Sequence, residues 1–316
     1  MSTSAEPILG VHVGRTMKLP DNKTASKDIS DAILKTVEEL NINAVQIFTH
    51  GPRNIIPNKI DYPALVAATS DIDLTVHSTY NSTKVWSIQP DTVDSKSSQD
   101  TLTAFKSQML SCKKANAWGL VLHVTKQYPD IVNNTMQILK PIAKKSGVKI
   151  ILEMVACYSD ADQTYETPEK ITNLTTLIGP NEPWWGWCID TAHLWSLGID
   201  VRSYDSMKAW FDSLIYKKKI VQFHLNGSCQ KFNGGKDGHE IAFSNADVIW
   251  KGVDPKKSGV RALVEFAMDH SCPIICEIDY EKTGDDIKDS LATIKQLAND
   301  YHQKKLLDMK AADTLD

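Results

Sequence analysis

Side chains that can bind a metal recur where short apolar runs of this sequence end. Six runs carry such a residue at or near their C-terminal end. After one of these runs, a further metal-binding residue follows one turn into the next loop. The candidates are His77, His123, Glu153, Asp190, His193, His224 and Glu277. The segment KDGH adds a chelating pair, Asp237 and His239. Any one of them alone is more typical of a hydrogen-bonding residue at a strand end. Together they are too costly to bury unless they are paired or bound to cations.

The composition of this set indicates which metals it suits, and how many. Its imidazoles and carboxylates offer mixed nitrogen and oxygen ligands, which suit Zn²⁺, with Mn²⁺ or Fe²⁺ as alternatives. At roughly three or four ligands per ion, the set is too large for one metal, and three ions with one bridging carboxylate accommodate it. Three divalent ions and the carboxylates leave a charge of about +2, which suits a phosphodiester. Clustered metals also suit its hydrolysis, because they generate hydroxide near neutral pH and stabilise both attacking and leaving oxygens.

The other histidines are not expected to bind a metal. His50 and His270 are interpreted as loop or surface residues, and His302 as part of the C-terminal tail. His12 lies near the end of the first apolar run and is interpreted as a neighbour of the ligands.

The apolar runs are typical of strands buried on both faces, because they are nearly continuous rather than alternating. They occupy residues 8–13, 43–48, 73–78, 119–124, 149–154, 185–190, 220–225 and 273–278. Between them, apolar residues at helical spacing predict helices over 28–40, 98–115, 130–146, 168–178, 203–217 and 286–301. Eight strands alternating with helices predict a single-domain α/β fold, a (β/α)₈ TIM barrel with the metal site at the C-terminal ends of its strands. No GxGxxG motif follows the first run, which argues against a Rossmann fold.

The expected boundaries follow from this pattern. The barrel is predicted over 8–302, between an N-terminal extension, 1–7, and a frayed C-terminal tail, 303–316. The longest irregular stretch is about 226–247, which is rich in Gly, Asn and Ser.

Bulk composition excludes several classes of protein. Of the 316 residues, 42% are hydrophobic, and the net charge of −4 argues against coating nucleic acid through bulk positive charge. Six scattered Cys without a CxxC pair favour a reduced, intracellular compartment over secretion. The N-terminus has no signal-peptide pattern, and no run approaches the ~18 apolar residues of a membrane span.

Seven motifs together resemble the endonuclease IV family of apurinic/apyrimidinic (AP) endonucleases over nearly the whole chain. They are LTVHSTY, GLVLHV, IILE, GWCIDTAHLWSLGID, FHLN, KDGH and IICEI. CIDTAHLW, with FHLN followed by DGH at this spacing, is a highly specific combination. The segments IDTAHLWSLGIDVRSY and GLVLHV are most similar in sequence to family members from large DNA viruses.

The resemblance implies a trinuclear zinc centre and distributes the ligands over it. In the implied centre, the first ion is bound by His77, His123 and Glu153. Glu153 also bridges to the second ion, which is completed by Asp190, His224 and Glu277. The third ion is bound by His193, Asp237 and His239. Glu153 and Glu277 are the implied catalytic residues. The implied reaction hydrolyses the phosphodiester 5′ to an abasic site in duplex DNA, which leaves a 3′-hydroxyl and a 5′-deoxyribose phosphate. Similar enzymes also clear blocked 3′ ends.

Two further positions match DNA-contacting residues of the family. Arg53, in FTHGPRN, matches the Arg that enters the helix where the lesion is flipped, and Tyr80, in HSTY, matches an aromatic near the abasic gap. The alternatives are a solvated loop Arg and a part-buried Tyr. The expected protein acts as a monomer, without a membrane, in the cytoplasm or nucleus, or in the virion if it is viral.

The chain departs from the family in the loop after FHLN. Gly227 stands where Asp is common, Gly238 where Arg is common, and IAFSNAD, 241–247, replaces the usual LGEG. None of these positions is a candidate ligand. They put the loop conformation in question, and with it the affinity for DNA or the substrate range, more than the reaction.

Two other functions stay open. A mononuclear sugar isomerase or epimerase of the same barrel superfamily would use Glu153, Asp190, His224 and Glu277 for one metal, but would not need the other five candidates. A catalytically weak protein that only binds abasic sites is the second, and the altered loop makes it conceivable.

Overall fold

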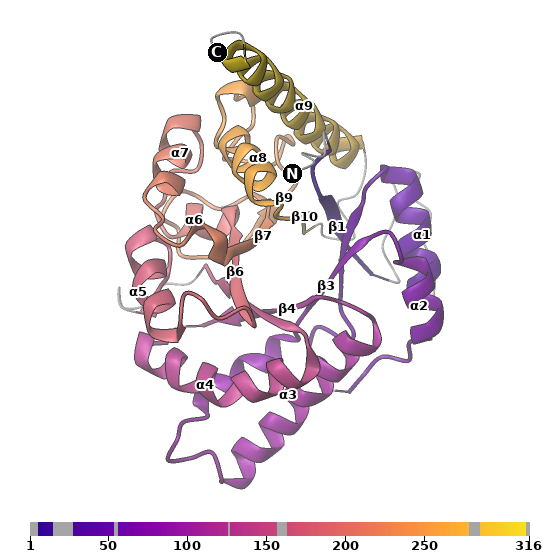
Figure 1. Ribbon diagram of the computed structural model, residues 1–316, viewed down its shortest axis with the longest axis vertical. Helices are drawn as coiled ribbons and strands as arrows, with labels where there is room; N and C mark the ends of the chain where they lie inside the picture. The colour runs from indigo at the N-terminus through magenta and orange to yellow at the C-terminus, as the bar shows by residue number, and fades with distance from the viewer. Residues whose placement is uncertain are drawn as a thin grey trace.

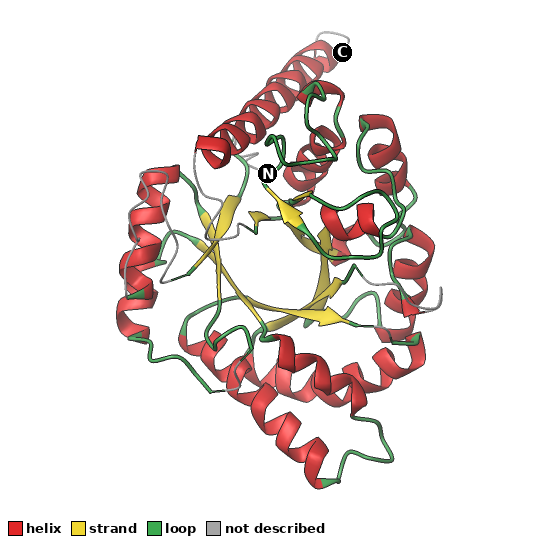
Figure 2. Ribbon diagram, turned by 180° about the vertical axis from the view of Figure 1, so that it is seen from behind, coloured by secondary structure: helices red, strands yellow, loops and turns green. Residues whose placement is uncertain are grey.

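The computed structural model describes residues 6–14, 28–53, 56–125, 127–156, 163–277 and 285–313. Within these residues, eight parallel strands close into a barrel in the order β1-β10-β7-β6-β5-β4-β3-β2. Figures 1 and 2 show the strands at the centre and the helices in a ring around them. The predicted TIM barrel is therefore confirmed.

The strands coincide with the apolar runs. β4, β5 and β6 have the expected bounds, and the others are slightly shorter than expected. The barrel strands are Leu9–Val13 (β1), Ala44–Ile47 (β2), Asp73–His77 (β3), Gly119–Val124 (β4), Lys149–Met154 (β5), Trp185–Asp190 (β6), Ile220–His224 (β7) and Ile274–Cys276 (β10). Residue 278, the last of the eighth run, lies outside the described residues.

The helices of the described segments include all six that were expected. They are Ile29–Leu40 (α1), Tyr62–Ala68 (α2), Lys96–Lys114 (α3), Pro129–Ser146 (α4), Pro168–Ile178 (α5), Thr191–Ser196 (α6), Tyr204–Asp212 (α7), Gly259–His270 (α8) and Asp285–Asp313 (α9). The expected set lacks α2, α6 and α8, of which α2 and α6 are too short to show a helical period. No helix in the described segments combines the length and the apolar character that crossing a membrane requires.

Two segments expected to be irregular contain regular structure. α9 continues to Asp313, so most of the expected frayed tail, 303–316, is helical. Its Lys, Leu, Met and Ala residues have high helix propensity, which explains the extension. In the stretch 226–247, Gly227–Ser228 (β8) pairs antiparallel with His239–Glu240 (β9).

The period of the strands carries polar side chains to the C-terminal end of the barrel. Residues two apart on a strand face the same side. Val121, Ile151 and Cys188 form a small buried cluster separate from the main core. Two residues further along the same strands are His123, Glu153 and Asp190. The strand register pairs His123 with Glu153, and Asp190 with His224. The barrel interior therefore changes from apolar to ionisable along its axis.

Gly10 of β1 has no room for a side chain against β2. A Cβ there would lie 2.0 Å from the backbone oxygen of Ala44. Because the neighbouring strand backbone cannot yield without disturbing the barrel, we expect Gly10→Ala to lower the free energy of unfolding by about 3 kcal/mol. Urea unfolding measures the loss.

Gly147→Ala is the matched control for this prediction. Gly147 has a φ of +75°, and nothing lies within 4 Å of an added Cβ. The expected loss in the variant's free energy of unfolding is about 1 kcal/mol, because an alanine is strained in the left-handed backbone conformation. Equal losses for the two variants would contradict the crowding at Gly10.

Candidate metal centre

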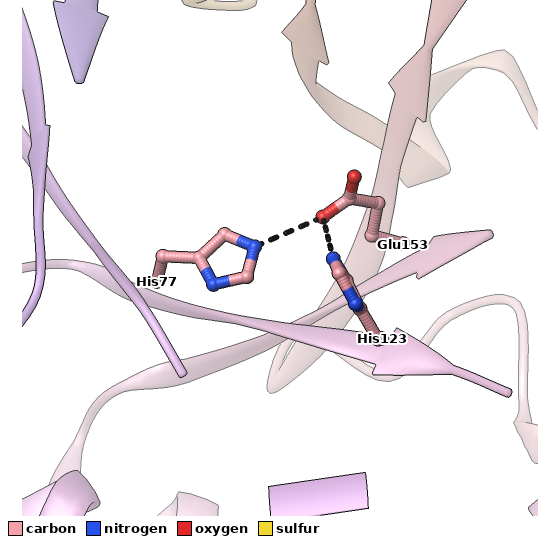
Figure 3. A group of neighbouring side chains, drawn as sticks. All are labelled: His77, His123 and Glu153. Atoms are coloured by element: carbon pink, nitrogen blue, oxygen red, sulfur yellow. Dashed lines mark ion pairs between the residues drawn. The ribbon is translucent and has the colours of Figure 1, made fainter. Parts of the chain in front are cut away.

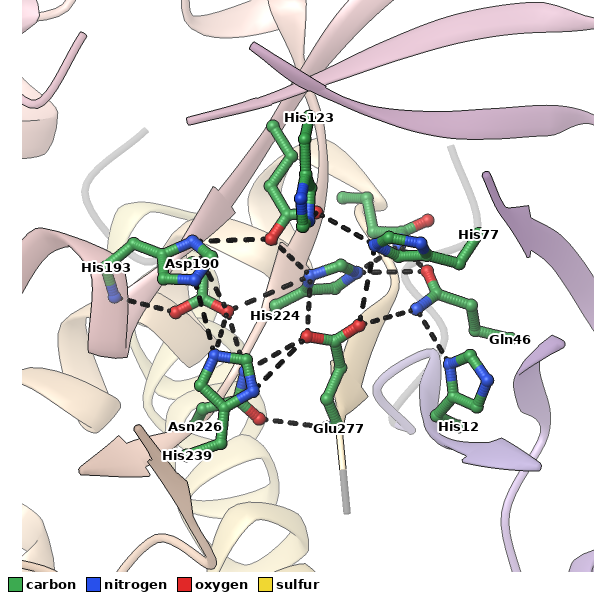
Figure 4. A network of polar contacts seen from close by, with 12 residues as sticks. His12, Gln46, His77, His123, Asp190, His193, His224, Asn226, His239 and Glu277 are labelled. Atoms are coloured by element: carbon green, nitrogen blue, oxygen red, sulfur yellow. Dashed lines mark hydrogen bonds and ion pairs between the residues drawn. The ribbon is translucent and has the colours of Figure 1, made fainter. Parts of the chain in front are cut away.

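The C-terminal ends of six barrel strands meet in one cluster of ionisable side chains (Figure 4). These side chains are His77 from β3, His123 from β4, Glu153 from β5, Asp190 from β6, His224 from β7 and Glu277, which follows β10. Glu153, Asp190 and His224 have no exposed surface. This end of a TIM barrel is where barrel enzymes build their sites.

The first group in the cluster is His77, His123 and Glu153 (Figure 3). The Nε2 atoms of His77 and His123 lie 3.3 Å and 3.2 Å from the same oxygen, Glu153 Oε2. His77 Nδ1 donates to the Ser78 carbonyl at 2.7 Å, so Nε2 of the neutral ring carries a lone pair. That lone pair faces a buried carboxylate oxygen that accepts no hydrogen bond from any described residue. Two such atoms need a proton or a cation between them.

The second group is Glu153, Asp190, His224 and Glu277, whose ligand atoms lie within 4.8 Å of one another. His224 Nδ1 is at their centre. It lies 3.1 Å from Glu153 Oε1, 3.3 Å from Glu277 Oε2 and 3.9 Å from Asp190 Oδ2. Three carboxylates around one imidazole nitrogen form a site that favours positive charge.

The third group joins His193 to Asp237 and to His239, the first residue of β9. His193 Nδ1 donates to the Met154 carbonyl at 2.7 Å, which leaves Nε2 facing the other two. That Nε2 lies 3.4 Å from His239 Nε2 and 3.5 Å from Asp237 Oδ1. His239 Nε2 lies 3.0 Å from Asp237 Oδ1. Asp237 is 58% exposed, so this group opens to solvent.

His193 was expected to lie in a loop, but it lies on the short helix α6. Asp190 is the N-cap of this helix, and its Oδ1 accepts a hydrogen bond from the His193 backbone N–H at 2.9 Å. Its other oxygen, Oδ2, lies 3.5 Å from His239 Nε2. The three-residue spacing is therefore a helix-capping spacing, which places one carboxylate between the second and third groups.

The charges of the cluster control its pKa values. Burial alone would raise the pKa of Glu153, but His224 and His123 outweigh it and hold the pKa well below its usual range. Burial alone would lower the pKa of His193, but the carboxylates of Asp190 and Asp237 raise it to about 10. Carboxylates that stay ionised while imidazoles gain protons indicate a strongly negative potential, which divalent cations would satisfy in place of those protons.

The donor set therefore fits divalent metal ions. Each of the three groups contains both nitrogen and carboxylate oxygen donors, a combination that suits Zn²⁺, Mn²⁺ or Fe²⁺. Glu153 belongs to both the first and the second group, and the ligand atoms of Asp190 also lie within 4.8 Å of those of His193 and His239. All nine residues expected as ligands lie in this one cluster.

The two positions expected to contact DNA lie together at the rim of the cluster. Tyr80 N–H donates to the Pro52 carbonyl at 2.8 Å, beside Arg53, which is exposed. The Tyr80 ring is 5.8 Å from that of His123, centroid to centroid, and 49% exposed. Partial burial and the nearby carboxylates raise the pKa of Tyr80 to about 12, so it remains a neutral phenol.

Asn226 is a residue of the centre that was not singled out from the sequence. Its Nδ2 donates to Asp190 Oδ2 at 2.7 Å, and its Oδ1 accepts from the Glu277 backbone N–H at 2.9 Å. Asn226 ends the FHLN motif, so the motif itself was the available signal. An amide attracts less notice than an ionisable ligand in a search for metal sites.

The other histidines differ in part from expectation. His12 is buried among the residues of the cluster, as expected, and burial lowers its pKa to about 3. His50 lies in the connection between β2 and α2, so the loop interpretation holds, but it is buried rather than on the surface, with Nδ1 3.1 Å from the Thr49 hydroxyl. His270 is half-buried against Phe266.

The altered loop is organised around Asp247. This fully buried carboxylate accepts hydrogen bonds from the backbone N–H groups of Ser228, Phe243, Ile249 and Trp250, at 2.8 to 3.2 Å. A Cβ at Gly227 would lie 2.5 Å from Asp247 Cγ. Gly227 and Asp247 are therefore complementary. Gly238 is also crowded, because its Cβ would lie 2.9 Å from Cys229 Sγ.

Comparison with known proteins places this barrel in a class. Residues 34–297 match the family model described as Xylose isomerase-like TIM barrel. The chain is 31% identical to a probable AP endonuclease of African swine fever virus, isolate Tick/Malawi/Lil 20-1/1983, over 74% of this chain and 78% of that protein.

Two solved structures agree with this placement. The crystal structure of AsfvAP:AG superposes with a TM-score of 0.79 at 26% identity, over 92% of this chain and 99% of that chain. Endonuclease IV from Thermus thermophilus gives a TM-score of 0.67 at 16% identity, over 93% and 100%, which shows the shared fold alone. The chain belongs to the endonuclease IV family of AP endonucleases, and the expected similarity to viral versions is confirmed.

Removal of divalent cations is expected to destabilise the protein. A ligand bound only to the folded state, at about 1,000 times its Kd, stabilises that state by about 4 kcal/mol. We expect dialysis against a chelator to lower the thermal unfolding midpoint and added Zn²⁺ to restore it. An unchanged midpoint, in protein shown by elemental analysis to have lost its metal, would contradict the role of cations in this cluster.

Restoring the residue common in the family at position 227 is expected to be harmful. Gly227→Asp would place a second carboxylate against Asp247, so we expect a loss of about 1–3 kcal/mol in the free energy of unfolding. The double variant Gly227→Asp/Asp247→Gly makes room for the new side chain. A double-mutant cycle in urea should therefore show a smaller loss than the sum of the single variants. Simple additivity would show that the two positions are independent.

Proposed function

We propose that this protein is a metal-dependent AP endonuclease that hydrolyses the phosphodiester 5′ to abasic sites in duplex DNA. Membership of the family supports the reaction class. The observation that carries the proposal is the size of the cluster. Four further histidines, His77, His123, His193 and His239, face residues that a mononuclear sugar enzyme would use, and Asp237 in turn faces His193 and His239.

The proposed cofactor is three zinc ions per chain, with Mn²⁺ or Fe²⁺ as alternatives. His77, His123 and Glu153 would hold the first ion, and His193, Asp237 and His239 the third. Glu153 would also contribute to the second, with Asp190, His224 and Glu277. Bound there, the ions would supply hydroxide near neutral pH and neutralise charge on the phosphodiester.

The side chains of the centre are arranged for this task. The backbone carbonyls of Ser78 and Met154 fix the protonated nitrogens of His77 and His193, so their Nε2 atoms point inward as acceptors. Glu153, fully buried, turns one oxygen to His77 and the other to His224. As the proposed bridging carboxylate, Glu153 is the proposed catalytic residue with the largest effect, and Glu277, which also faces His224 Nδ1, is the second.

The rim residues are proposed to recognise the lesion. Arg53 is exposed beside the cluster, where it can enter the DNA helix, and the Tyr80 ring borders His77 and His123. Extruding a nucleotide costs least where base pairing is already lost, so such groups favour abasic sites. The proposed products are a 3′-hydroxyl and a 5′-deoxyribose phosphate, and blocked 3′ ends are proposed substrates too. The proposed enzyme acts as a monomer, within the cell or virion that holds its DNA.

A duplex with one tetrahydrofuran abasic analogue tests the proposal. We expect a single nick on the 5′ side of the analogue, which is lost after prolonged chelation and restored by Zn²⁺. Protein with three bound ions that leaves the duplex intact would refute the endonuclease and favour a protein that only binds abasic sites. One tightly bound ion, with epimerisation of a ketose, would favour the sugar enzyme.

Glu153→Gln tests the bridging carboxylate. Losing the partner of a metal ligand typically costs about 10–100-fold in activity. We expect the cleavage rate of Glu153→Gln to fall by more than that, because Glu153 is itself a proposed ligand. Glu265→Gln is the control, because Glu265 is a partly buried carboxylate on α8 that bonds Tyr204 and Arg261, and the variant should cleave normally. Retained cleavage in Glu153→Gln would show that the assignment of Glu153 is wrong.

A further inference from the structure

Gln46 of β2 is a fully buried amide that lies among the residues of the cluster (Figure 4). It is not ionisable, and nothing in its sequence surroundings distinguishes it from the strand. A buried glutamine amide has two N–H donors and one oxygen that can accept two hydrogen bonds, and each of these that lacks a partner is costly.

All of these positions of Gln46 are occupied. Its Nε2 donates to Glu277 Oε1 at 2.9 Å and lies 3.2 Å from His12 Nδ1. Its Oε1 accepts from Gln222 Nε2 at 2.9 Å and lies 3.0 Å from His224 Nε2. The amide therefore joins side chains from β1, β7 and the end of β10.

The orientation of this amide is fixed by Glu277. An ionised carboxylate only accepts hydrogen bonds, so the group facing Glu277 must be the NH₂ group. The oxygen of Gln46 then faces His224, and His224 Nε2 must carry the proton that this oxygen accepts. Gln222 Nε2 also lies 3.0 Å from His224 Nε2, but two donors do not bond each other, so its proton goes to Gln46.

The proton on Nε2 determines the state of the other ring nitrogen of His224, Nδ1. With the proton held on Nε2, the neutral ring presents the Nδ1 lone pair to Glu153, Glu277 and Asp190. His77 and His193 present Nε2 instead, because backbone carbonyls hold their Nδ1 protons. Of these three rings, His224 is the one whose tautomer depends on a side chain.

We propose that Gln46 is a positioning residue that sets the tautomer of His224 and holds the carboxylate of Glu277 for the second metal ion. This inference rests on the metal centre proposed above. Partners of this kind orient a metal ligand and raise its basicity, and their loss typically weakens metal binding by about 10–100-fold.

Gln46→Met tests the inference, because Met has a similar volume and no hydrogen-bonding amide. We expect the variant to bind one of its zinc ions about 10–100-fold more weakly in competition with a chelator, while the other two stay bound. Gln108→Met is the matched control. Gln108 is a buried glutamine on α3 whose amide bonds Thr79 and Ser82, and its loss should leave all zinc affinities unchanged.

A second measurement does not require the variant to fold. In zinc-loaded wild-type protein with ¹⁵N-labelled histidine, long-range ¹H–¹⁵N spectra should show the His224 proton on Nε2. A proton on Nδ1, or zinc affinity in Gln46→Met equal to wild type, would overturn the inference and leave the proposed function standing. Wild-type protein that binds none of Zn²⁺, Mn²⁺ and Fe²⁺ would instead overturn the proposed function.

Discussion

The structure depends on one electrostatic constraint, the mutual repulsion of buried electron-rich atoms at the end of the barrel. Carboxylate oxygens and imidazole nitrogens face one another at 3.0 to 3.5 Å, and Glu153 lies among them without exposed surface. Positive charge reconciles such a group with burial, either as protons on the imidazoles or as metal ions between the ligands. Burial of apolar surface between the strands and the helices around them stabilises the fold and offsets this repulsion.

Shared residues make the cluster one unit. Glu153 faces the histidines of the first group with one oxygen and His224 with the other. Asp190 caps α6 with Oδ1 and faces His239 with Oδ2, so formation of that helix and placement of His193 occur together. Asp247 has the same effect on the outer loop, because it holds β8, which pairs with the strand that carries His239. Local folding and site geometry are thus hard to separate.

The barrel and the membership of the cluster could be predicted because both follow from the period of strands. Val121 and His123, two apart on one strand, share a face, and the same alternation places Glu153 beside His123 in the register. The family motifs then supplied Arg53 and Tyr80, whose proximity at the rim depends on the Pro52–Tyr80 contact between the segments that follow β2 and β3.

What could not be predicted depends on contacts between residues distant in the chain. The tautomer of His224 is set by Gln46, which is 178 residues away. Asn226 and Asp247 act through backbone N–H groups, which a sequence does not display. The short helix α6 is stabilised by its cap rather than by an apolar period, and α9 continues because of local propensity where no apolar stripe is needed.

The nine clustered side chains are proposed to bind three metal ions. An anomalous difference map recorded at the zinc absorption edge, from crystals grown with Zn²⁺, tests this proposal most directly. We expect one peak among His77, His123 and Glu153, a second among Glu153, Asp190, His224 and Glu277, and a third among His193, Asp237 and His239. A single peak in the second position, with the other two groups empty at saturating zinc, would contradict this proposal.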